Sequence, residues 1–322
     1  AWEAAAGGGV TFKTFGTNSI MVGDDATGTI NAANNNTALG VDVFASLTSG
    51  DNNVAIGYQA LDSNTTGSNN SAVGSGALGA NTSGDYNTAM GLEVLNKNTT
   101  GASNSAFGRE TMFRNTTGGY NTAVGMNALN SNTTANSNSA LGFEAMRTNT
   151  TGTNNVAVGR ESLRSSTTGG TNTAVGSSAM FTNTTGEQNS VLGHQALYSN
   201  TTGSANVVMG LNTMYYNTTG SNNVALGRDA LQKNTTASNN TAVGKAALFA
   251  NTTGSENTAV GETALDANTT GASNTALGRA ALSAATTANS NTAVGESALR
   301  FSTTGAFNVA VGTSALDANT TG

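Results

Sequence analysis

The stretch NTAVGMNALNSNTTANS at residues 121–137 is followed directly by NSALGFEAMRTNTTGTN at residues 138–154, which repeats the same pattern. The Asn that opens this pattern recurs every 17 residues from Asn36 to Asn308, which makes 17 copies without an insertion. We number the positions of each copy 1 to 17 from this Asn. A fixed short period is typical of a solenoid, in which each repeat forms one coil that stacks on the next.

Three positions of the repeat are invariant: Asn at position 1, Gly at position 5 (Gly40 to Gly312) and Thr at position 13 (Thr48 to Thr320). Position 4 is always apolar, position 8 is mostly Ala, and position 9 is Leu or Met except for Phe44. The recurrent Gly and the Asn-Thr-Thr-Gly segment leave no window long enough for a stable helix. We therefore predict two short strands per coil, at NTAVG and at xxALxx, and an all-β parallel β-solenoid of 17-residue coils.

Stacking places equivalent residues of successive coils above one another, about 4.8 Å apart. Stacked Asn side chains can hydrogen-bond to one another and to turn backbone. Gly at position 5 permits a positive φ or a closely packed corner, and the Thr hydroxyl at position 13 can cap a backbone group. We therefore predict structural ladders that include Asn121, Gly125, Leu129, Thr133, Asn138, Gly142 and Thr150.

Both neighbours in the pairs Ala-Val and Ala-Leu are apolar, although successive strand residues point to opposite faces. Strands that are apolar on both faces are usually covered on both. We therefore expect another copy of the chain to cover the outer face, since closed homo-oligomers are common. The alternative is a monomeric solenoid in which small Ala side chains stay exposed.

The motifs NVAIG at residues 53–57 (Asn-Val-Ala-Ile-Gly) and NSAVG at residues 70–74 resemble the head repeats of trimeric autotransporter adhesins of the YadA type. The irregular NSIMVG at residues 18–23 is closer still to the spacing of that family. The longer NTALGxxALxxNTTGxxN unit is similar to repeats of phage tail fibres and related bacterial fibre proteins. The resemblance covers residues 36–322 and implies a left-handed β-roll packed as a homotrimer. It also places the protein outside the cell, in a virion tail fibre or on a cell surface.

Two regions differ in their sequence. Residues 1–35 are expected to form an N-terminal join with an irregular first coil, because AWEAAAGGGVTF resembles the Gly-rich join before a fibre segment. Residues 36–322 contain the seventeen repeats. The chain opens without Met and stops within a repeat, so we expect it to be part of a longer protein.

The composition excludes several classes of function. Only 9% of the 322 residues are charged, the net charge is -6, and there is no cysteine. These values argue against a nucleic-acid surface, which needs clustered Lys and Arg, and against disulfides or thiolate metal sites. No run of about 18 apolar residues is present to span a membrane as a helix.

No residue pattern points to catalysis. The single histidine, His194, stands at a variable position, where neighbouring copies carry Ser177 and Leu211. The carboxylates alternate with Arg, Asn and Ala, and pairs such as Arg109-Glu110 indicate an outer face of mixed charge. We therefore expect neither an enzyme nor a cofactor.

Positions 10 and 11 carry the informative variation. Aromatic and arginine side chains there are typical contact anchors. We name six residues as candidate partner contacts, with packing between subunits or on turns as the alternative: Phe113, Arg114, Phe181, Tyr198, Tyr215 and Tyr216.

The leading hypothesis is a structural and adhesive fibre shaft that projects a binding tip toward a cell-surface glycan or protein receptor. The alternative is an ice- or surface-binding solenoid built on the threonines of positions 13 and 14, such as Thr133 and Thr134. Neighbouring strand residues face opposite ways, so this pair supplies one outward row where a flat face needs two. An enzyme with residues shared between subunits ranks last.

Overall fold

A computed structural model describes residues 11–13, 19–23 and 32–321, and it divides into two units, residues 1–154 and 155–322, which are described separately. The described residues of both units form strands and turns without a helix. Unit 1 contains β1 (Thr11–Lys13), β2 (Ile20–Gly23), β3 (Thr37–Leu39), β4 (Val54–Ile56), β5 (Ser71–Val73), β6 (Thr88–Met90), β7 (Ser105–Phe107), β8 (Thr122–Val124) and β9 (Ser139–Leu141). Unit 2 contains β10 (Val156–Val158), β11 (Thr173–Val175), β12 (Ser190–Leu192), β13 (Val207–Met209), β14 (Val224–Leu226), β15 (Thr241–Val243), β16 (Thr258–Val260), β17 (Thr275–Leu277), β18 (Thr292–Val294) and β19 (Val309–Val311).

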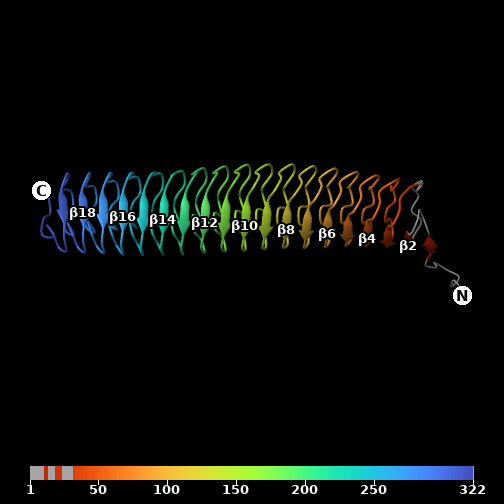
Figure 1. Ribbon diagram of the computed structural model, residues 1–322, viewed down its shortest axis with the longest axis horizontal. Coiled ribbons are helices and arrows are strands. Elements are labelled where there is room, and N and C mark those ends of the chain that lie inside the picture. The colour runs from red at the N-terminus through yellow and green to blue at the C-terminus, as the bar shows by residue number, and fades with distance from the viewer. Residues whose placement is uncertain (1–10, 14–18, 24–31, 322) are drawn as a thin grey trace. The chain divides into compact units, whose positions relative to one another are not determined.

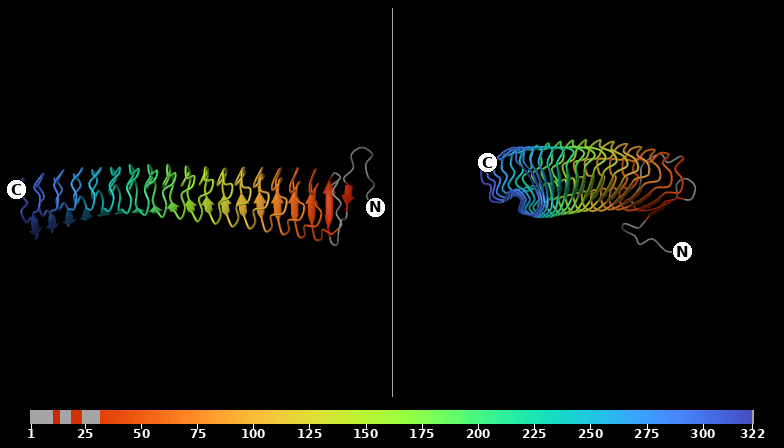
Figure 2. Two further views of the ribbon diagram at one scale, coloured as in Figure 1. Left: turned by 90° about the horizontal axis from the view of Figure 1, so that it is seen from above. Right: turned by 60° about the vertical axis from the view of Figure 1, so that its left-hand side comes forward.

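The repeat strands of each unit pair in parallel with the register of the repeat. In unit 1, Ala123 of β8 pairs with Ala140 of β9, and in unit 2, Ala174 of β11 pairs with Val191 of β12. Figures 1 and 2 show the strands of each unit side by side in chain order, along one side of the coils. The prediction of an all-β parallel β-solenoid is confirmed, with one coil per 17-residue repeat.

Small side chains fill the interior of each coil. In the coil that begins at Asn121, the Ala123, Ala128 and Leu129 side chains are fully buried. The Asn side chains of positions 1 and 12 share this interior, as Asn121 and Asn132 do. A coil this narrow has room for Ala, one larger apolar residue and two amides, which explains why the repeat varies so little at these positions.

The prediction of a second strand per coil is wrong. Residues 126–131 form turns, and Asn127 and Leu129 adopt φ values of 59° and 49°. A positive φ is costly for a residue such as Leu, and it is retained here because the surrounding coils hold the backbone in place. It breaks the alternation of a strand, so that Ala128 and Leu129 both point inward. The apolar pair Ala-Leu therefore leaves no apolar side chain outside.

The invariant Gly of position 5 ends each strand in a corner that no other residue fits. Gly125 has a φ of 131°, and a Cβ on it would lie 2.4 Å from the carbonyl oxygen of Gly142 in the next coil. Both the backbone angle and the contact therefore require Gly at this position.

The N-terminal region contains one further coil segment. In NSIMVG, Ile20, Met21 and Val22 of β2 pair in parallel with Thr37, Ala38 and Leu39 of β3. Ser19 takes the place of the invariant Asn, and its Oγ accepts a hydrogen bond of 3.0 Å from the Asn36 N–H. The expected Gly-rich join at residues 1–10 lies outside the described residues.

Candidate binding surface

The predicted Asn ladder of position 1 lies inside the coil wall. The Asn121 N–H and Nδ2 both donate to Asn104 Oδ1 at 3.1 Å, and Nδ2 also donates to the Ala135 carbonyl at 2.9 Å. In the next coil, the Asn138 N–H donates to Asn121 Oδ1 at 3.0 Å, and Asn138 Nδ2 donates to the Gly152 carbonyl at 2.9 Å. Each amide thus joins two coils and closes the turn of its own coil.

The other predicted ladder residues also serve the coil. Thr133 Oγ1 donates to the Thr150 carbonyl at 3.1 Å, and the Leu129 side chain is fully buried. Gly125 and Gly142 both adopt positive φ at the end of a strand. These residues share the wall and interior of the coils and present no reactive group to solvent.

A second Asn ladder lies at position 12, where the Asn-Thr-Thr-Gly segment predicts only a turn. Asn98 Nδ2 donates to Asn81 Oδ1 at 2.8 Å and to the Gly101 carbonyl at 2.9 Å. The recurrence of Asn at position 12 from Asn64 onward was the available signal. In unit 2, Ala285 interrupts this ladder between Asn268 and Ser302.

The threonines of positions 13 and 14 differ in their hydrogen bonding and exposure. The hydroxyl of position 13 bonds to the next coil, as Thr235 Oγ1 donates to the Thr252 carbonyl at 3.0 Å. At position 14, Thr236 is exposed. The coil thus exposes one row at position 14, which is Thr except for Ser49 and Ser83, whereas a flat ice-binding face needs two.

Four of the six candidate partner contacts come together in unit 2. The Phe181, Tyr198 and Tyr215 rings stack in parallel, with centroids 5.0 Å and 4.9 Å apart. The Tyr216 ring meets Tyr215 at an angle of 70° with centroids 4.7 Å apart. The Arg164 guanidinium lies over the Phe181 ring at 5.4 Å and begins this row. We call Phe181, Tyr198, Tyr215 and Tyr216 the aromatic ladder.

Phe113 and Arg114 belong to unit 1 and are not part of the aromatic ladder. The Lys97 ammonium lies 5.8 Å from the centroid of the half-buried Phe113 ring, and Arg114 is exposed. This arrangement is a cation–π contact of modest strength at an exposed site.

A hollow of about 200 Å³ borders the aromatic ladder, lined by Gln195, Asn212, Tyr215, Tyr216 and Gln232. Its amide residues were not predicted. Gln195 and Asn212 stand at position 7, where the backbone forms a turn with positive φ and both side chains line the hollow. The sequence pattern predicts a strand at this position instead. Burial, followed by the neighbouring Tyr198 and Tyr216 phenols, raises the pKa of Tyr215 above its usual value.

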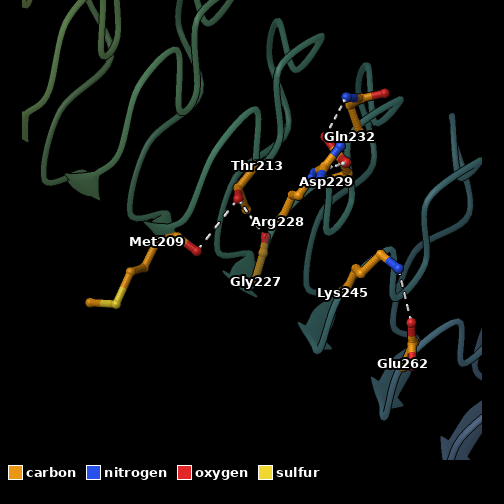
Figure 3. A network of polar contacts seen from close by, with 8 residues as sticks. All are labelled: Met209, Thr213, Gly227, Arg228, Asp229, Gln232, Lys245 and Glu262. Carbon is orange, nitrogen blue, oxygen red and sulfur yellow. Dashed lines mark hydrogen bonds and ion pairs between the residues drawn. The ribbon is translucent and has the colours of Figure 1, made fainter.

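Charged residues pair on the outer surface, as the prediction of a mixed-charge face states. Arg109 Nη2 lies 2.7 Å from Glu110 Oε1, and Arg228 Nε lies 3.0 Å from Asp229 Oδ2. Figure 3 shows Asp229 between Arg228 and Gln232, whose Nε2 donates to Asp229 Oδ1 at 3.0 Å. Such exposed pairs contribute little to the stability of the fold.

The remaining candidates for chemistry are dispersed. His194 is exposed at position 6. Within residues 11–13, 19–23 and 32–321, no three His, Asp or Glu side chains gather closely enough to hold a metal ion. Burial raises the pKa of Asp266, and burial and then the charge of Asp42 raise that of Asp62.

The described part of the chain has no helix that is long and apolar enough to cross a membrane. In comparisons with known proteins, no protein-family model matches this chain and no curated protein is a significant match.

Proposed function

We propose that this chain is a segment of a structural and adhesive fibre, a stiff shaft assembled from three copies that projects a binding tip. A phage tail fibre or a bacterial surface adhesin, both extracellular, fits this role. The observation that carries the proposal is a row of apolar side chains on the outer face of the strands in each unit.

Stiffness is supported by hydrogen bonds that join neighbouring coils within each unit, both in the strand and in the polar turn. In unit 2, the Thr173 N–H donates to the Asn189 carbonyl at 2.8 Å in the strand. The Thr184 N–H donates to the Thr201 carbonyl at 2.9 Å in the polar turn. A chain bonded in this way gains length by adding coils and needs no globular core.

The outer strand face supports assembly with further copies. Position 4 is apolar in every coil, and its side chains remain accessible, with Leu141 50% exposed in unit 1 and Met209 51% exposed in unit 2. Contiguous exposed apolar patches are uncommon on soluble monomers and mark interaction sites. The row comprises Leu39, Ile56, Val73, Met90, Phe107, Val124 and Leu141 in unit 1, and Val158, Val175, Leu192, Met209, Leu226, Val243, Val260, Leu277, Val294 and Val311 in unit 2.

A groove in this face of unit 2 adds to the argument. An apolar hollow of about 250 Å³ lies over β11, β12 and β13, and Val175, Leu192 and Met209 contribute to its lining. Side chains of another copy at the same position are of the right size and polarity to fill it. A parallel trimer with cyclic symmetry brings identical rows together around its axis.

The mass of the assembly tests the proposal. Each chain has a mass of 31.9 kDa, so sedimentation equilibrium should give three times this value at micromolar concentration. Electron micrographs of the same sample should show straight rods. A mass equal to one chain, or compact globular particles, would contradict the proposal.

Cysteine cross-linking tests which face mediates assembly, because the chain has no cysteine of its own. Val175→Cys places a thiol in the apolar row, and oxidation should link chains of the same assembly into covalent dimers. Thr185→Cys at the exposed position 14 is the matched control and should remain monomeric on a denaturing gel. Equal cross-linking of both variants would refute assembly through the strand face.

A further inference from the structure

The parallel stack of rings within the aromatic ladder ends at Tyr215, because position 10 of the next coil is Gln232, which has no ring. The Tyr216 ring is 51% exposed and stands at 70° to the Tyr215 ring, so the two rings form a corner. The electron-rich face of an aromatic ring attracts the weakly positive C–H groups of an apolar surface. The corner therefore offers a stacking surface beside the hollow.

Three amides complete the hollow with both donors and acceptors. The Gln232 amide is fixed, because its Nε2 donates to Asp229 Oδ1 at 3.0 Å. The side-chain amides of Gln195 and Asn212 make no hydrogen bond with other described residues, and both side chains stand on turns with φ values near 53° and 52°. A fixed polar group binds a ligand at a smaller entropic cost than a mobile one.

The five side chains that line the hollow are uncharged. Asp229, which accepts a hydrogen bond from Gln232, pairs with Arg228 at 3.0 Å between Arg228 Nε and Asp229 Oδ2. Anionic ligands and nucleic acids would find no cation among the lining residues to offset their charge. Proline-rich peptides dock in grooves between aromatic side chains, whereas three of the five lining residues here carry amides.

We propose that Tyr215, Tyr216, Gln195, Asn212 and Gln232 form a binding site for a neutral oligosaccharide on the side of the shaft. A sugar ring has the two surfaces that this site matches, a C–H face for the tyrosine corner and adjacent hydroxyls for the amides. All five residues come from one chain, so the site does not depend on the oligomer number. It adds a lateral binding site to the shaft role proposed above.

The test is binding of neutral oligosaccharides to the full chain. The probes are cellohexaose, maltohexaose and hexameric β-1,4-linked N-acetylglucosamine, measured by saturation-transfer NMR with titration. We expect at least one probe to receive saturation from the protein. Tyr216→Ala should then weaken binding at least tenfold, as truncation of an exposed aromatic anchor does.

A second variant and a control separate the site from general surface effects. The double variant Gln195→Ala and Asn212→Ala should weaken binding about thirtyfold, since it removes two hydrogen bonds that contribute roughly 1 kcal/mol each. The chain itself carries Ala at position 7 in Ala246 and at position 11 in Ala250, so these replacements suit the coil. Tyr120→Ala removes a tyrosine that is 72% exposed in unit 1 and should leave binding unchanged.

Three results would overturn the inference. The first is that none of the three probes binds, and the second is that Tyr120→Ala weakens binding as much as Tyr216→Ala. The third is a change in sedimentation mass on Tyr216→Ala, which would make this corner a contact between copies. Because the mass is measured separately from probe binding, failure of the glycan site is distinguishable from failure of the proposed trimer.

Discussion

Ala285 leaves a defect in the position 12 ladder that a single substitution should repair. Asn268 Oδ1 is buried without a hydrogen-bond partner, and Ser302 Oγ on the other side of Ala285 is also unpaired. In intact parts of the ladder, an amide in the next coil donates to this oxygen, as Asn251 Nδ2 does to Asn234 Oδ1 at 3.0 Å. Ala285→Asn restores that donor.

The coil can accommodate the larger side chain. Ala285 is followed three residues later by Ala288 rather than Gly, and the same combination occurs at Asn234, whose Nδ2 donates to the Ala237 carbonyl at 3.0 Å. The introduced amide should therefore also donate to the Ala288 carbonyl. Ser302 occupies position 12 of the next coil, where its hydroxyl can donate to the side-chain oxygen of the introduced Asn.

The expected gain follows from these bonds. Pairing a buried oxygen recovers about 1–3 kcal/mol of desolvation cost, and a second hydrogen bond adds about 1 kcal/mol. Ordering the new side chain costs about 1 kcal/mol. We expect a net stabilisation of about 2 kcal/mol, which is more than a tenfold change in the local opening equilibrium.

Hydrogen exchange followed by mass spectrometry measures this change locally, and it avoids the assumption of two-state unfolding that a repeat array violates. Peptides that span residues 265–305 should exchange at least tenfold more slowly in Ala285→Asn, while those from unit 1 stay unchanged. Ala284→Asn adds the same amide at a half-buried neighbouring position and serves as the control. Unchanged exchange, or equal protection by the control, would refute the hydrogen-bond argument.

Three further predictions concern the coil wall and its surface. Gly125→Ala should lower the guanidinium midpoint by the equivalent of about 3 kcal/mol or more, because its φ of 131° and the 2.4 Å approach to the Gly142 oxygen both oppose a Cβ; an unchanged midpoint would contradict this. Burial and then Asp42 raise the folded pKa of Asp62 above its ordinary 3.8, so the folded state binds the proton more tightly and stability falls as pH rises through that range. Asp62→Asn should therefore unfold at a higher denaturant concentration than the parent at pH 7, and the two midpoints should converge below pH 3.8. A difference between the midpoints that grows in acid would contradict the raised pKa of Asp62. Asn98 forms a glycosylation sequon but is fully buried with Nδ2 bonded, so an oligosaccharyltransferase should modify the denatured chain and leave the folded one unmodified by mass spectrometry.

The strand and its interior were predictable from sequence because they depend on repetition alone. A 17-residue period without insertions fixes the register, so that Ala123 must stack with Ala140, and the invariant Gly125 marks a corner that no Cβ fits. Parallel stacking then follows from general rules of solenoids.

The turn from position 6 to position 11 could not be predicted in the same way. Leu129 adopts a φ of 49°, which local preference disfavours for Leu, and only the hydrogen bonds and packing of neighbouring coils select it. The Leu129 N–H, for example, donates to the Ala145 carbonyl at 3.0 Å in the next coil. Tertiary structure overrides local propensity at this position.

The candidate binding surface was predictable in part for the same reason. Period-17 register alone places Phe181, Tyr198 and Tyr215 above one another, and these aromatics were named from the sequence. Gln195 and Asn212 approach them only through the turn at position 7, so their contribution required the backbone geometry.

The division of the coil into a bonded wall and outward positions affects how this protein can change over generations. Positions 10 and 11 hold Asp, Ser, Arg, Phe or Tyr in otherwise similar coils, so the backbone accepts new side chains there without rearrangement. Each coil contacts only its two neighbours, so a mutation at these positions has local effects. Selection can therefore alter what the surface recognises one coil at a time, while the residues that hold the coils together stay the same.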